Sequence, residues 1–123
     1  MNYNWDWGIF FKPTGIGSEI YLDWFFTGLG WTIAIALVGW IVALLLGSLL
    51  GVMRTVPNRW ISGIATTYVE IFRNVPLLVQ LFLIYYGLPG LGITLSRELS
   101  AFIALGLNSG AYQAEYLRGS ILA

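Results

Sequence analysis

The stretch WFFTGLGWTIAIALVGWIVALLLGSLLGVM, from Trp24 to Met53, decides the fold class of this 123-residue chain. Asp23 precedes the stretch and Arg54 follows it, and no charged residue lies between them. A helix needs roughly 20 predominantly apolar residues to cross the hydrocarbon core of a bilayer, and this stretch is longer. It therefore predicts a transmembrane helix over 24–53.

Two further segments without charged residues follow the first. One runs from Asn74 to Ser96, and the other runs from Leu99 to Ala114. Together with their flanking residues, they predict spans over about 63–87 and 99–122. The expected fold class is therefore all-α, a polytopic membrane protein with three transmembrane helices.

The composition supports a membrane protein and excludes several other classes. Apolar residues make up 58% of the chain and charged residues only 10%, about half the charged fraction that is usual in soluble domains. The formal net charge is zero, so a basic surface for nucleic acid is not expected. Cysteine and histidine are absent, which excludes thiolate metal sites and most acid–base sites. We therefore expect no catalytic residue, no metal and no cofactor.

The arginines of the short loops predict the orientation. Arg54 and Arg59 flank the connection after the first span, and no acidic residue lies between them. Because cytoplasmic loops hold the excess of Lys and Arg, this connection is expected on the cytoplasmic side and the N-terminus outside. The second connection, about Gly87 to Glu98, should then be extracytoplasmic.

The segment before the first span is rich in Trp and Phe. Amphipathic rings settle in the headgroup layer, so an interfacial anchor is the simplest interpretation, and a ligand-stacking role is the alternative. A cleaved signal peptide is not expected, because residues 1–23 lack a basic start and the apolar stretch that follows is too long. The predicted organisation is an extracytoplasmic or interfacial segment over 1–23 and a transmembrane domain over 24–123.

Small residues recur at every fourth position in two predicted spans. The first ridge comprises Gly39, Ala43, Gly47 and Gly51, and the second comprises Gly106, Gly110 and Ala114. Residues four apart lie on one face of a helix, and small side chains with this spacing let membrane helices approach closely. We therefore expect helix–helix contacts at both ridges. The alternative is that glycine is simply frequent in membrane helices.

Polar side chains enter the second and third predicted spans. Glu70, Arg73 and Asn74 share one helix face, and Gln80 lies further along. Ionisable groups at membrane depth are costly, so they usually pair or face a protein interior or a wet cavity. Either Glu70 and Arg73 form an ion pair near the cytoplasmic interface, or the polar face belongs to a translocation path for an anionic or zwitterionic solute. The third span carries Asn108, Ser109, Tyr112, Glu115 and Arg118.

Pro76 interrupts the second span. Proline has no N–H and crowds the preceding turn, so it should bend the helix or free the carbonyl of Phe72 close to Arg73. A backbone group that is freed inside a membrane must line a cavity or be covered.

Three segments together resemble the polar amino-acid (histidine/glutamate) permease family of bacterial ABC importers. They are RTVPNR over 54–59, YVEIFRNVPLLVQ over 68–80 and AYQAEYLRG over 111–119. The second segment is the most specific, and the match runs from about Trp24 to Ala123. The opening NWDWGIF over 4–10 is similar to glutamate/aspartate import permeases in particular.

The resemblance implies a permease subunit that imports an amino acid, glutamate or aspartate, across the bacterial inner membrane. It implies a second permease subunit, two cytoplasmic ATPase subunits and an extracytoplasmic solute-binding protein as partners, with membrane lipid around the helices. The residues expected in the translocation path are Glu70, Arg73, Asn74, Gln80, Asn108, Tyr112, Glu115 and Arg118.

The family pattern continues past the last residue of this sequence into further spans and a loop that docks on the ATPase. The chain is therefore expected to be the N-terminal part, a truncated type-1 transmembrane domain. The alternative function is a non-transporting membrane scaffold or a truncated pseudo-permease.

Overall fold

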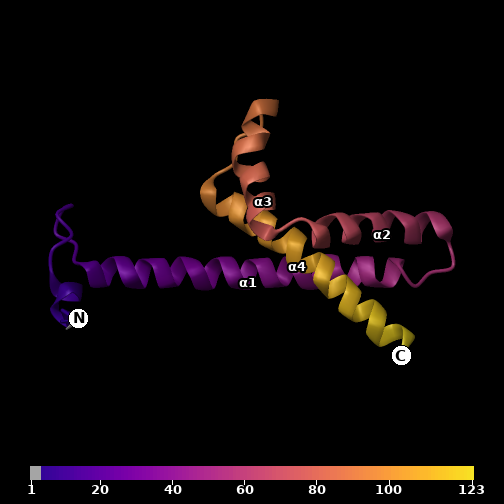
Figure 1. Ribbon diagram of the computed structural model, residues 1–123, viewed down its shortest axis with the longest axis horizontal. Helices are drawn as coiled ribbons and strands as arrows, with labels where there is room; N and C mark the ends of the chain where they lie inside the picture. Colours follow the sequence, from indigo (N-terminus) through magenta and orange to yellow (C-terminus); the bar gives the residue numbers. More distant parts are fainter. Residues whose placement is uncertain (1–3) are drawn as a thin grey trace. The chain divides into compact units, whose positions relative to one another are not determined.

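The computed structural model describes residues 4–123, and helices make up most of them (Figure 1). The chain forms two compact units, one that ends at Ala34 and one from Ile35 to Ala123. The first three residues of the predicted segment 1–23 lie outside the described residues. The division into units follows packing, and the predicted membrane boundary after residue 23 stays a prediction.

The N-terminal segment folds into a short 3-10 helix, η1 (Trp7–Phe11), and a turn. The Asp6 carboxylate caps η1, because it accepts hydrogen bonds from the Gly8 N–H at 3.1 Å and from Lys12 Nζ at 2.5 Å. Pro13 and Ile20 then pair in an isolated antiparallel bridge. Trp5 and Trp7 are both 72% exposed, and their rings stack with centroids 5.9 Å apart. The interfacial anchor stays a prediction.

The first predicted span is the helix α1 (Tyr21–Met53). It begins three residues before the predicted start, and the Asp23 carboxylate accepts a hydrogen bond from the Ile20 N–H at 3.0 Å there. Within residues 4–123, α1 alone is long and apolar enough to cross a membrane by itself. The central part of the helix was predictable because its apolar run is continuous. Its exact start depends on the hydrogen bond from the Ile20 N–H to the Asp23 carboxylate.

The second predicted span is two helices instead of one bent helix over 63–87. α2 (Arg59–Asn74) ends before an extended Val75, and α3 (Leu77–Phe82) starts after Pro76. The axis turns by 100° between Arg59–Asn74 and Leu77–Leu91, and Figure 1 shows α3 leaving the end of α2 steeply. Proline disfavours the helical conformation of the residue before it. The predicted bend is therefore present, but as a complete break.

α3 continues into the π-helix η2 (Leu83–Gly87) and the 3-10 helix η3 (Leu88–Leu91), and α4 (Arg97–Leu122) follows. α4 corresponds to the third predicted span, and Ser96 caps it by accepting from the Leu99 N–H at 3.1 Å. By length and composition, the bent pair would be a second membrane span if its two parts are counted together. The predicted number of three spans stays a prediction.

The core of the second unit lies where α1, α2 and α4 meet. The α1 ridge and the α4 ridge face each other: Gly39, Gly47 and Gly51 lie against Leu105, Gln113 and Leu117, and Gly106 and Gly110 lie against Val42 and Leu46. Beside this contact, a buried cluster joins the three helices through Leu50, Ala65, Val69 and Ala114. The two ridges thus bring the backbones of α1 and α4 close together within one chain.

Candidate functional site

One carboxylate, that of Glu115 on α4, faces three guanidinium groups. Arg54 Nη1 lies 2.5 Å from Glu115 Oε2, and Arg73 Nη1 lies 3.1 Å from the same oxygen. Arg118 Nη1 lies 3.9 Å from Glu115 Oε1. We call these four residues the Glu115 cluster. A single negative charge faces three positive charges here, so the cluster carries surplus positive charge.

The arginines of the cluster differ in exposure. The Arg54 side chain is 3% exposed, whereas those of Arg73 and Arg118 are 37% and 41% exposed. Arg54 Nε is buried and has no hydrogen-bond partner among the described residues. Arg54 is therefore an internal partner of Glu115, and Arg73 and Arg118 are the arginines that a solute could reach.

Arg73 makes a second contact, with an aromatic ring. Its guanidinium carbon lies 5.8 Å from the centre of the Tyr112 ring, within the range of a cation–π interaction. The neighbouring Glu70 carboxylate instead accepts from Asn74 Nδ2 at 3.4 Å. The ion pair that the structure gives Arg73 is thus with Glu115 on α4, and no ion pair between Glu70 and Arg73 is present among residues 4–123.

The break between α2 and α3 is held by two side-chain amides. Gln80 Nε2 donates to the carbonyl oxygens of Phe72 and Val75, both at 2.8 Å. Asn108 Nδ2, from α4, donates to the same Phe72 oxygen at 3.2 Å. The carbonyl that Pro76 was predicted to free is therefore free of its helix partner and bound by amides. Gln80 is buried, and its Oε1 has no partner among residues 4–123.

The structure separates the predicted path residues into three groups. Arg73, Tyr112, Glu115 and Arg118 gather around the Glu115 carboxylate, Gln80 and Asn108 hold the α2–α3 break, and Glu70 and Asn74 bond to each other on the exposed face of α2. Arg54 was missed, because the sequence assigned it to a cytoplasmic loop. Its position seven residues after Gly47 placed it on the same helix face as the α1 ridge, and that spacing was the available signal.

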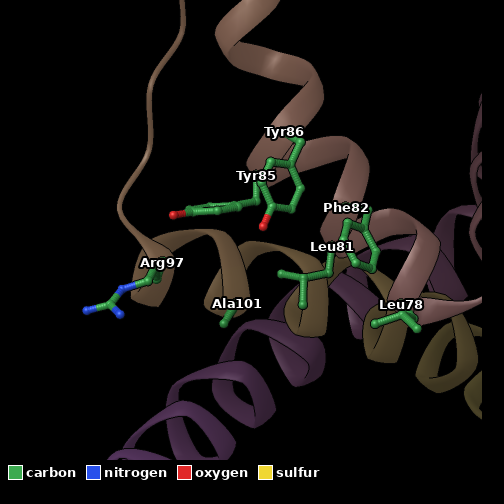
Figure 2. A pocket seen from close by; sticks show the side chains of 7 residues that line it. All are labelled: Leu78, Leu81, Phe82, Tyr85, Tyr86, Arg97 and Ala101. Carbon is green, nitrogen blue, oxygen red and sulfur yellow. The ribbon is translucent and has the colours of Figure 1, made fainter.

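A separate cavity of about 250 Å³ lies between α3, η2 and α4 (Figure 2). It is lined by Leu78, Leu81, Phe82, Tyr85, Tyr86, Arg97 and Ala101. Figure 2 shows the Arg97 guanidinium pointing away from the rings, so the wall that remains is almost entirely apolar. None of the predicted path residues lines it. A wall with so little polar surface does not suit a charged solute, and the Glu115 cluster is the better candidate site.

Comparisons with known proteins identify the family. Residues 43–122 match the family described as binding-protein-dependent transport system inner membrane component. The chain is 42% identical to the glutamate/aspartate import permease protein GltJ of Escherichia coli K12, over 98% of this chain and 54% of that protein. It is 38% identical to the L-cystine transport system permease protein TcyB of Bacillus subtilis, over 78% of this chain and 41% of that protein.

A solved structure is also similar. The crystal structure of an amino acid ABC transporter with histidines superposes with a TM-score of 0.80 at 35% identity, covering 84% of this chain and 48% of that one. The chain spans about half the length of the curated relatives it matches. The predicted resemblance to amino-acid permeases of ABC importers is confirmed, and the chain belongs to the family of binding-protein-dependent transport system inner membrane components.

Proposed function

We propose that this chain forms part of a permease subunit of an ATP-driven importer for glutamate or aspartate in the bacterial inner membrane. The observation that carries the proposal is the Glu115 cluster, where one carboxylate faces three guanidinium groups and the Arg73 side chain is 37% exposed. A guanidinium matches the planar geometry of a carboxylate and binds it through paired hydrogen bonds. Arg73 would therefore receive a carboxylate of the acidic amino acid.

The proposed path follows the polar sides of α2 and α4. Arg73 and Tyr112 would form the anion-binding part, and the exposed Glu70 and Asn74 would offer an acceptor and a donor to the zwitterionic backbone of the solute. Gln80 and Asn108 would keep the α2–α3 break in place. Glu115 and Arg118 complete the proposed set. In this arrangement, a break in a membrane helix lines the path, where irregular backbone is tolerated.

Replacing Arg73 tests this function. In vesicles that carry the permease, its paired subunit, the ATPase subunits and the binding protein, Arg73→Ala should lower ATP-driven glutamate uptake by about tenfold or more, because a hydrogen bond to a charged group contributes roughly 1.5–3 kcal/mol. Arg59→Ala is the matched control, since Arg59 stacks on Trp60 at 5.7 Å, outside the Glu115 cluster. Normal uptake by Arg73→Ala, with normal amounts of protein in the membrane, would contradict the proposed path.

The partners are also proposals. The family description names a binding-protein-dependent transport system, which supports an extracytoplasmic solute-binding protein. A second permease subunit and two cytoplasmic ATPase subunits complete the proposed importer. The second candidate function is a non-transporting scaffold or a truncated pseudo-permease, which the close α1–α4 contact favours because small residues there let the two helices pack tightly. Complexes that assemble but show no ATP-driven uptake of any amino acid would favour the scaffold.

We further propose three spans with the N-terminus outside, with 1–23 as the extracytoplasmic segment and 24–123 as the membrane domain. The support is the loop after α1, which contains arginine and no acidic residue, as is usual on the cytoplasmic side. Arg54 is buried in the Glu115 cluster, so Arg59 is the exposed cation of that loop. The cysteine-free sequence makes the test direct. Of single cysteines introduced near Pro57 and near Leu91, only the one near Leu91 should react with an impermeant thiol reagent added from outside. Reaction of the cysteine near Pro57 would contradict the proposed orientation and would place the loop after α1 outside.

A further inference from the structure

Arg54 is fixed at the end of α1 in a way that turns its side chain inward. Its N–H donates to the Leu50 carbonyl at 3.1 Å, and its own carbonyl accepts from Ser62 Oγ at 3.3 Å. The side chain is 3% exposed and reaches Glu115 on α4. A buried guanidinium without a carboxylate would be very costly, so Glu115 is the group that makes this placement possible.

Arg54 and Arg73 compete for the same carboxylate oxygen. Glu115 Oε2 lies 2.5 Å from Arg54 Nη1 and 3.1 Å from Arg73 Nη1. The carboxylate carries one negative charge and cannot neutralise both guanidinium groups. Its stronger interaction is with Arg54, which is closer and buried. Arg73 is therefore left incompletely neutralised, beside the Tyr112 ring and 37% exposed.

The two arginines thus differ in whether they can bind a solute. Arg54 cannot itself receive a solute, because its side chain is buried. Arg73 can, but only while Glu115 does not neutralise it fully. We propose that Arg54 is a positioning residue: by holding the Glu115 carboxylate, it keeps Arg73 available to the carboxylate of the transported amino acid. This inference rests on the proposed function and adds to it the residue that sets the affinity of the anion site.

Equilibrium binding of radiolabelled glutamate to the purified permease–ATPase complex, without the binding protein, measures this effect. Arg54→Gln should raise the Kd about tenfold, because Glu115 then pairs fully with Arg73 and the site loses one positive charge. Arg54→Lys should keep most of the affinity. Arg59→Gln, a neutralised arginine outside the cluster, should bind like the wild type.

The double variant Arg54→Gln/Glu115→Gln separates positioning from a merely structural role. It removes the competing carboxylate together with Arg54, so the Kd should return to within about threefold of the wild-type value. A double variant that binds no better than Arg54→Gln overturns the inference, and so does an Arg54→Gln variant with unchanged Kd. A wild-type complex that neither binds nor takes up glutamate overturns the proposed function itself, and the inference with it.

Discussion

Two regions of the second unit pack their helices in different ways. Where α1 meets α4, glycines leave no room for a side chain: a Cβ built at Gly47 would lie 2.5 Å from Gln113 Cβ and 2.9 Å from the Gly110 carbonyl oxygen. Where α2 meets α3, polar side chains are added, and the amides of Gln80 and Asn108 bind the carbonyls around the Pro76 break. The first region depends on shape and the second on hydrogen bonding.

The difference teaches where to look for stability and where to look for function. A contact between small residues has no polar group to satisfy, so it can serve as a rigid support. A broken helix has carbonyls that must be bound, and the Phe72 carbonyl that Gln80 and Asn108 bind directly precedes Arg73 of the Glu115 cluster in the sequence. Substitutions in the two regions should therefore fail for different physical reasons.

The largest effect is expected from Gly47→Leu. A leucine there must displace Gln113 and also the Gly110 backbone, which cannot yield by a change of rotamer. Overpacking commonly costs 1–3 kcal/mol, and this site should lose about 3 kcal/mol or more of unfolding free energy. Unfolding of the detergent-solubilised protein, followed by circular dichroism as SDS is added, measures it.

Gly63→Leu is the matched control for this substitution. Gly63 lies within α2, and no atom lies within 4 Å of a Cβ built there. Its effect should stay within about 0.5 kcal/mol. Equal losses for both variants would mean that the α1–α4 contact has no special role and that any glycine-to-leucine change disturbs this chain.

An intermediate effect is expected from Gln80→Leu. The change keeps a side chain of similar size but leaves the Val75 carbonyl without the amide that binds it. A buried acceptor without a partner costs about 1–3 kcal/mol, and the same SDS titration measures the loss. Asn108→Leu should cost less, because the Phe72 carbonyl keeps its bond to Gln80.

Pro76→Ala sharpens this part of the comparison. Alanine supplies the N–H that proline lacks, so the Phe72 carbonyl can regain a helix partner. In that background, the double change Gln80→Leu/Asn108→Leu, which removes both amides from the Phe72 carbonyl, should cost clearly less than in the wild type. Identical costs in the two backgrounds would show that the amides do not act by replacing the missing backbone hydrogen bond.

The smallest effect is expected at the exposed N-terminal cap. The Lys12 ammonium, which donates a hydrogen bond to the Asp6 carboxylate, lowers the pKa of Asp6 below its ordinary value of 3.8. Because the folded pKa is below the unfolded one, the cap contributes above about pH 4 and is lost as the pH falls through the lowered pKa. Hydrogen exchange of the Gly8 amide should be protected at neutral pH and lose that protection only in strong acid.

Asp6→Asn provides the control for the cap. Asparagine keeps an oxygen for the Gly8 N–H but loses the charge that attracts Lys12. Gly8 protection in this variant should be weaker and independent of pH between 7 and about 3. The same acid-sensitive profile in Asp6→Asn would assign the titration to another group.

Much of the fold follows from local sequence. The run from Trp24 to Met53 predicts α1 because hydropathy is a property of consecutive residues, and only the start moved, to Tyr21. Pro76 predicts the place of the break because its missing N–H and its ring act on adjacent turns. The size of the turn, 100° between the helix axes, depends on what packs against both sides of the break and could not be predicted.

The sequence by itself also selected the polar residues of the predicted spans, since the cost of burying polar groups holds whatever the fold. It could not say which of them meet. Arg73 is near Glu70 in the sequence but pairs with Glu115, and Arg54 follows an apolar helix yet is buried beside the same carboxylate. Composition and spacing determined the long apolar helix, the place of the break and the candidate residues. Only the packing of α1, α2 and α4 decided the charge partners, because long-range contacts depend on how helices approach each other in space.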